Sequence, residues 1–228
     1  MNNLQQTYQA HSDVTAVRHR VLRNTYWLLA LSMLPTVLGA WAGVQFNFAF
    51  FSGSPFMGVI VFLAIAFGFF YAIEKNKNSS IGVALLLCFT FFMGLMLSRL
   101  ISQTLTFSNG PALIMTAFGG TAMILGVMAT VATVSKRDFT GMGRWLFMGL
   151  LVIIVASIAN IWLQLPALQL TISVVAIGIF SAFILHDVQR IINGGETNYI
   201  TATLGIYLSV YNIFANLLAL LGIFGGDD

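Results

Sequence analysis

Long apolar segments alternate with short polar ones along most of this chain. Seven of the apolar segments approach the ~20 residues that a helix needs to cross a hydrocarbon core of roughly 30 Å. The expected spans are residues 26–46, 55–73, 80–97, 111–134, 145–163, 170–185 and 199–224. The pattern therefore predicts an all-α integral membrane protein, built as a bundle of seven transmembrane helices in a lipid bilayer.

Composition supports this fold class. Hydrophobic residues make up 58% of the 228 residues and charged residues 7%, whereas soluble domains are about 25% charged. The ten Lys and Arg residues are scattered between apolar segments and form no basic patch, so we expect no nucleic-acid partner. The first 24 residues are polar and lack the apolar core of a removable signal peptide. We expect residues 1–24 to be a flexible tail and residues 25–228 to form one membrane domain.

Positive charge gathers on one side of the predicted bundle. If the crossings alternate, the tail and the polar connections 74–78, 135–144 and 187–198 share a side and carry nine of the ten Lys and Arg, the exception being Arg99. Cytoplasmic loops show this excess of positive charge. The sequence predicts a multi-pass protein of the inner (plasma) membrane with a cytoplasmic N-terminus and a periplasmic C-terminus.

No metal or catalytic pattern is found in the sequence. His11 and His19 lie in the tail, His186 is isolated, and the single Cys88 lies in an apolar segment. Neither HExxH nor paired cysteines occur, and no buried Ser–His pair or pair of membrane carboxylates suggests intramembrane proteolysis. We expect no metal, no cofactor and no enzymatic activity.

Two acidic residues stand out between the sixth and seventh spans, Asp187 and Glu196. A carboxylate close to hydrocarbon is costly and usually has a partner or a function. Asp187 either pairs with Arg190 or sits in water at the helix end, or it faces the bundle interior and gates a cation or proton pathway. We expect Gly194 and Gly195 to supply a turn and Glu196 to stabilise the first turn of the seventh helix.

Polar residues form a stripe on the seventh span. Ser209, Asn212 and Asn216 are spaced by three and four residues and share one helix face. Inside a membrane such a face should meet protein or water. Hydrogen bonds between helices, worth about 0.6 kcal/mol each, are one interpretation and a hydrated pathway is the other. Ser209 and Asn212 therefore join Asp187 and Arg190 in a candidate ion or gating site.

Glycines at four-residue spacing occur in the spans, including Gly39 with Gly43. Such spacing lets helix backbones approach closely. It indicates tight packing without identifying the helix that packs there.

Several segments carry a family resemblance: VLRNTYWLL (21–29), FGGTA (118–122), IANIWLQLPALQLTIS (158–173), INGGETNYITAT (192–203) and IYLSVYNIF (206–214). They resemble the Bax-inhibitor (transmembrane Bax inhibitor motif) family, and within it the bacterial YccA branch. The resemblance implies a seven-helix fold with the last helix central and an inner-membrane location. It also implies binding to the membrane-anchored AAA protease FtsH, as a slow substrate that modulates the enzyme.

The family's other described activity is a pH-sensitive calcium leak that depends on two aspartates. In this sequence the first position falls on Asp187 and the second on Ser209, which is not ionisable. A pair of carboxylates that share a proton cannot form there. The resemblance therefore favours a non-enzymatic protease modulator. Since a processive protease needs an unstructured end to engage, we expect the tail, residues 1–24, to be offered to the protease. A calcium or proton leak with Asp187 as the titrating group is the alternative.

Overall fold

The computed structural model describes residues 2–48 and 55–226, which form seven α-helices and one short 3-10 turn. Each helix contains a segment long and apolar enough to cross a membrane. This confirms the predicted seven-helix membrane fold, and the predicted turn over 47–54 lies mostly outside the described residues. The helices are α1 (Asn2–Gln45), α2 (Pro55–Lys75), α3 (Ser80–Thr104), α4 (Gly110–Val134), α5 (Gly143–Leu163), α6 (Pro166–Ile192) and α7 (Tyr199–Gly225).

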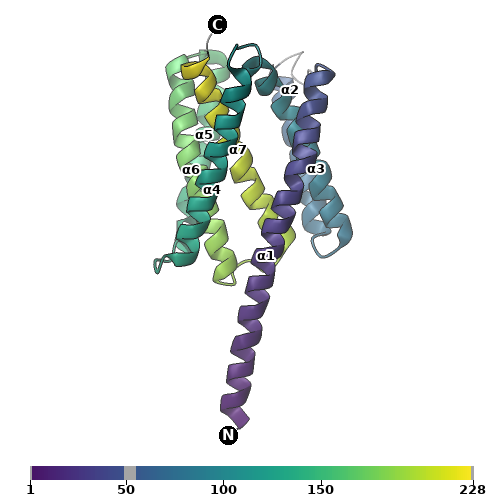
Figure 1. The fold of residues 1–228 in the computed structure, drawn as a ribbon, viewed down its shortest axis with the longest axis vertical. Helices are drawn as coiled ribbons and strands as arrows, with labels where there is room; N and C mark the ends of the chain where they lie inside the picture. The colour runs from purple at the N-terminus through teal and green to yellow at the C-terminus, as the bar shows by residue number, and fades with distance from the viewer. Residues whose placement is uncertain (1, 49–54, 227–228) are drawn as a thin grey trace.

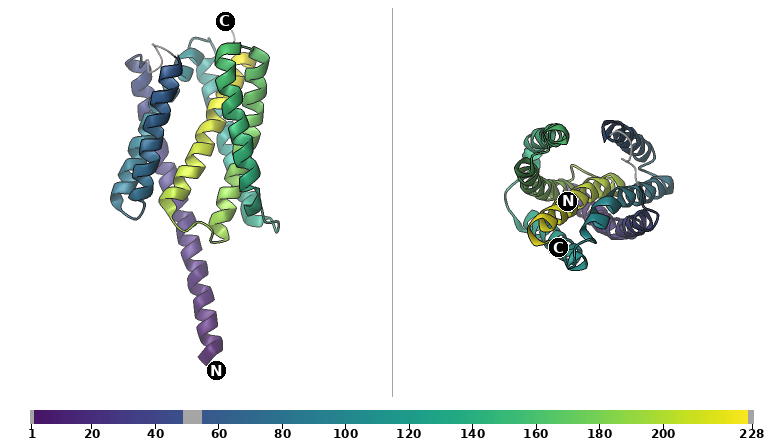
Figure 2. Two further views of the ribbon diagram at one scale, coloured as in Figure 1. Left: turned by 180° about the vertical axis from the view of Figure 1, so that it is seen from behind. Right: turned by 90° about the horizontal axis from the view of Figure 1, so that it is seen from above.

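The last helix, α7, lies between two groups of three helices (Figures 1 and 2). In the first group α3 contacts α1 and α2, and in the second α6 contacts α4 and α5. α7 contacts α1, α2, α3, α4 and α6. Within the described stretch 198–222, no residue is exposed. The central position expected for the last helix is therefore confirmed.

The backbones of α1 and α3 touch at glycines. A Cβ atom on Gly39 would lie 2.1 Å from the carbonyl oxygen of Phe91, and one on Gly94 would lie 2.1 Å from that of Thr36. Gly43 faces Ser98 in the same contact, where a Cβ would lie 2.5 Å from the serine Oγ. The four-residue glycine spacing on α1 thus serves packing within one chain.

One end of the bundle carries most of the positive charge. The α2–α3, α4–α5 and α6–α7 connections lie at the end where the N-terminal part of α1 leaves the bundle, and the C-terminus lies at the opposite end (Figure 1). We call this the basic end: residues 18–23, 74–78, 135–144 and 186–198, which hold nine of the ten Lys and Arg. The helices thus alternate in direction in the way that the charge pattern assumed (Figure 1).

α1 differs from its prediction at the N-terminus. In place of a flexible tail over 1–24, the structure has helix from Asn2 onward, continuous with the first span. Residues 2–24 contain neither Gly nor Pro, so nothing in them stops a helix that the membrane segment already stabilises. The N-terminal part of α1 projects beyond the bundle (Figure 1).

α6 also extends beyond its predicted end at residue 185. It continues to Ile192, about two turns further. The residues that the sequence placed in a polar joint, including Asp187 and Arg190, are therefore helical, and the connection to α7 is only the short segment 193–198.

Candidate functional site

Asp187 lies at the basic end with its side chain between α6 and α7. The side chain is 21% exposed, and its Oδ1 is 2.9 Å from Nδ1 of His186. Its Oδ2 faces Gly205 of α7, 3.1 Å from where a Cβ on that glycine would lie. A side chain at position 205 would therefore crowd the carboxylate.

His186, which has no other histidine close to it in the sequence, is the hydrogen-bond partner of Asp187. The imidazole is 12% exposed. A Cβ on Gly143, the first residue of α5, would lie 2.9 Å from its Nε2. The His186–Asp187 pair thus lies where the ends of α5, α6 and α7 meet, and it was missed because adjacent residues on a helix rarely face each other.

One interpretation of the sequence paired Arg190 with Asp187, but the structure gives Arg190 other partners. Its Nε donates to the carbonyl oxygen of Gly195 at 3.3 Å, and its Nη2 lies 3.7 Å from Oε2 of Glu196. The chain turns back after α6 and brings Glu196 to the Arg190 guanidinium. Helical spacing alone had suggested Asp187 as the partner of this group. Arg190 therefore stabilises the α6–α7 connection.

The α6–α7 connection contains the predicted glycine turn. Gly194 has a φ of 80°, a conformation that favours glycine. Glu196 Oε1 accepts hydrogen bonds from the backbone N–H groups of Thr197 at 3.0 Å and Asn198 at 2.9 Å. Since α7 begins at Tyr199, Glu196 precedes the helix, and the prediction that it acts within the first turn is wrong.

Asn198 is the residue that caps α7. Its side-chain Oδ1 accepts from the N–H groups of Ile200 at 2.9 Å and Thr201 at 3.3 Å. Its Nδ2 donates to the carbonyl oxygen of Lys77 and to Oδ1 of Asn78, both at 2.9 Å. An Asn directly before an apolar helix is an N-cap signal, so this cap was predictable from the sequence. The bonds to the α2–α3 connection could not be read from it.

The polar stripe on α7 bonds mainly to its own helix. Ser209 Oγ donates to the Gly205 carbonyl oxygen at 3.2 Å, and Asn212 Nδ2 donates to that of Leu208 at 2.8 Å. Asn216 repeats this pattern on the carbonyl of Asn212 at 2.8 Å. Ser209 is buried and one turn beyond the glycine that faces Asp187. The hydrogen bonds of these three donors therefore stay within α7.

Tyr207 of α7, rather than the polar stripe, makes a hydrogen bond to another helix. Its hydroxyl lies 2.9 Å from Oγ1 of Thr36 on α1 and 3.4 Å from the carbonyl oxygen of Thr90 on α3. All three residues are buried. This contact joins the central helix to two of its neighbours in the interior of the bundle.

Gln189 fastens the α4–α5 connection to α6. Its side chain is buried, donates to the carbonyl oxygen of Arg137 at 2.6 Å and accepts from the N–H of Phe139. Within the connection, Asp138 accepts hydrogen bonds from the hydroxyl and backbone N–H of Thr140, which lower the pKa of Asp138. The basic end is thus a hydrogen-bonded surface that joins all three connections to helix ends.

The charged groups of this end define what it can do chemically. Among the described residues, no three His, Cys, Asp or Glu side chains come together to hold a metal ion. His186 and Asp187 are both partly exposed, so solvent reaches this pair. Of the four predicted gating residues, Asp187 faces Gly205, one turn before Ser209 on α7, and Arg190 contacts Gly195 and Glu196 instead.

The seven long apolar helices, packed with the last helix central, define a polytopic membrane protein. The chain belongs to the Bax-inhibitor family, since the family described as "Inhibitor of apoptosis-promoting Bax1" matches residues 18–226. The resemblance seen in the sequence is thereby confirmed.

Relatives from several bacteria resemble the chain over most of its length. It is 37% identical over 209 residues to the Escherichia coli K12 protein named "Modulator of FtsH protease YccA", a match that covers 92% of each chain. It is 35% identical over 228 residues to an uncharacterized membrane protein of Vibrio cholerae, with complete coverage of both chains. An uncharacterized protein of Neisseria meningitidis is 37% identical over 223 residues, or 97% of each chain.

Proposed function

We propose that this protein binds and modulates a membrane-anchored AAA protease of the FtsH type, without catalytic activity of its own, and is itself a slow substrate of that protease. The observation that carries the proposal is the 37% identity, over 92% of each chain, to the relative named as a modulator of FtsH protease. Similarity of this extent covers the bundle as a whole rather than one motif.

The N-terminal part of α1 supplies a segment that a processive protease can engage. It projects beyond the bundle (Figure 1). The contact of Arg18, whose Nη1 donates to the carbonyl oxygen of Ile192 at 3.4 Å, marks where α1 meets the end of α6. In proteins most helical stability comes from tertiary packing rather than from intrinsic propensity, and this part lies outside the bundle (Figure 1). The projecting part can therefore unfold locally and enter a narrow channel.

Packing of α1 explains why degradation would then be slow. α1 contacts α3, α6 and α7, and its backbone touches α3 at Gly39. Pulling α1 out of the bundle breaks these contacts and moves an apolar span into water at roughly 25 cal/mol per Å² of exposed apolar surface. A protease that holds the N-terminus would be occupied while it attempts this step.

The proposed orientation places the basic end, and with it the N-terminus, in the cytosol. Nine of the ten Lys and Arg lie at that end, as expected for cytoplasmic loops. The end that a cytosolic protease would meet is therefore the one from which α1 projects.

Degradation by a purified FtsH-type protease tests this function. The full chain should be degraded slowly and should slow cleavage of a second substrate, whereas a chain that begins at Arg18 should resist degradation. A matched control replaces residues 2–17 with an unrelated polar sequence of equal length, which should restore degradation. The proposal fails if the shortened chain is degraded, and still slows cleavage of other substrates, just as the full chain does.

A cation leak is the second candidate, and the position of Asp187 favours it. The carboxylate is partly buried and faces Gly205 of α7, one turn before the buried Ser209. In proteoliposomes, Asp187→Asn should then reduce calcium or proton flux, while Glu196→Gln, which changes another acid at the basic end, should not. Flux that is the same for Asp187→Asn and the parent at every pH would exclude this candidate.

A further inference from the structure

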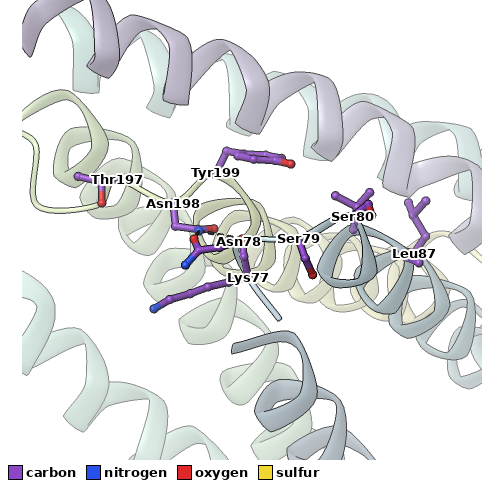
Figure 3. Close-up of a pocket in the computed structure, with 10 residues that line it drawn as sticks. Lys77, Asn78, Ser79, Ser80, Leu87, Thr197, Asn198 and Tyr199 are labelled. Atoms are coloured by element: carbon purple, nitrogen blue, oxygen red, sulfur yellow. Dashed lines mark hydrogen bonds between the residues drawn. The ribbon is translucent and has the colours of Figure 1, made fainter. Parts of the chain in front are cut away.

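An open pocket of about 680 Å³ lies at the basic end, between the α2–α3 connection, the first turns of α3 and the start of α7 (Figure 3). Polar residues from the two connections form its rim, among them Lys77, Asn78 and Thr197. Val83, Ala84 and Leu87 of α3 form its apolar floor. The pocket is therefore polar on one side and apolar on the other.

Hydrogen bonds join the two polar walls of this pocket. Asn198 donates to the carbonyl oxygen of Lys77 and to the side chain of Asn78, both at 2.9 Å. The same side chain caps α7 through Ile200 and Thr201. The rim is thus held by a defined set of contacts across two connections.

The pocket lies at the level where two candidate spans begin, which is the expected level of the bilayer surface. Ser80 and Tyr199, which line it, are the first residues of the third and seventh candidate spans. The floor residues Val83 and Leu87 are one helical turn apart on α3 and lead from the rim into the span. Lipid headgroups lie at this level and acyl chains lie along the spans below it.

Lys77 supplies positive charge at the rim. Its ammonium group pairs with the exposed Glu74, and this hydrogen bond raises the pKa of Lys77, so the side chain is cationic at neutral pH. Glu196 also acts on Lys77 from the α6–α7 connection, where it faces Arg190. An exposed ion pair contributes little to stability because water screens it, so a phosphate group can replace Glu74 as the partner of Lys77.

We propose that this pocket binds the headgroup of an anionic glycerophospholipid from the leaflet at the basic end. The phosphate diester would face Lys77, with rim hydroxyls such as that of Thr197 donating to its oxygens. One acyl chain would lie along Val83 and Leu87. A soluble anion would leave this apolar floor in contact with water, whereas a lipid covers it. This site goes beyond the proposed protease modulation and does not depend on it.

Lipid binding to the purified, delipidated full chain in a neutral detergent tests the site, with native mass spectrometry as the readout. Dioleoyl phosphatidylglycerol should bind about five-fold more tightly than dioleoyl phosphatidylcholine, as expected for about 1 kcal/mol from one Lys near the membrane surface. Lys77→Gln should remove this difference. Lys75→Gln, a matched change in the same connection but outside the pocket lining, should preserve it.

A second variant and a soluble probe distinguish a lipid site from a site for small anions. Ala84→Trp places a large side chain on the pocket floor and should weaken binding of both lipids. Inorganic phosphate at millimolar concentration should not displace phosphatidylglycerol. The proposal is overturned if phosphate displaces the lipid, if Lys75→Gln acts as strongly as Lys77→Gln, or if Lys77→Gln leaves the preference for phosphatidylglycerol intact. Should Ala84→Trp fail to fold, the comparison of the two lysine variants decides alone.

Discussion

The hydroxyl group of Tyr207 on α7 lies 2.9 Å from that of Thr36 on α1, and both side chains are buried. The Tyr207 hydroxyl also reaches the backbone of α3 through the carbonyl of Thr90. One phenol thus connects the central helix with the helix whose N-terminus projects from the bundle. The same contact resists removal of α1.

Tyr207→Phe should destabilise the bundle by about 0.6 kcal/mol, and by no more than about 1.7 kcal/mol, the measured range for hydrogen bonds between membrane helices. The loss is modest because Thr36 keeps its bond to the carbonyl oxygen of Ser32 at 2.9 Å. Unfolding in detergent measures the effect. Tyr71→Phe on the exposed face of α2 is the matched control, and an equal change in the two variants would contradict the assigned role of Tyr207.

Gly94→Ala should separate α1 from α3. The new Cβ would lie 2.1 Å from the carbonyl oxygen of Thr36, and backbone cannot move aside as a flexible side chain can. Overpacking of this kind costs about 1–3 kcal/mol. Unfolding in detergent should show this loss, whereas Gly126→Ala, where a Cβ meets open space, should be neutral or slightly stabilising. Equal stability of the two variants would show that the α1–α3 contact is looser than described.

The Gly94→Ala variant also connects structure with the proposed function. If α1 is the first helix that the protease extracts, weaker α1–α3 packing should increase the rate of degradation. Gly126→Ala should leave that rate unchanged. A rate that does not respond to Gly94→Ala, in a variant shown to be destabilised, would place the slow step elsewhere.

Asn198→Ala should loosen two segments at once. The variant loses the cap of α7, worth about 0.5–2 kcal/mol, together with the bonds to Lys77 and Asn78. Hydrogen exchange should accelerate both in the first turn of α7 and in residues 76–79. The neighbouring Thr197→Ala, which removes an exposed side chain, should affect neither segment. Faster exchange in α7 alone would indicate that the bonds across the connections contribute little.

The membrane fold was predictable because bilayer thickness fixes the length of a span. The start of α7 at Tyr199 and the end of α4 at Val134 were predicted to the residue. The N-terminal helix of α1 was not, because polar composition suggested irregular chain while the absence of Gly and Pro allowed a helix. Composition alone does not decide between these two outcomes.

The partners at the basic end were less predictable, since they depend on how the chain turns. Arg190 was placed beside Asp187 by helical spacing, yet the turn at Gly194 brings Glu196 back to the guanidinium. The pocket rim could not be predicted either. Lys77 and Asn198 are far apart in the sequence, and only the fold brings them together. Glycine spacing on α1 indicated a close contact but could not identify α3.

The most direct test of protease modulation is the cleavage rate of a reporter substrate by a purified FtsH-type protease in proteoliposomes, measured at increasing amounts of this protein. The rate should fall and reach a plateau as the protein approaches the protease in molar ratio. An unrelated polytopic membrane protein at equal density should have no effect. A reporter rate that stays constant up to a large molar excess of this protein would contradict the proposed function.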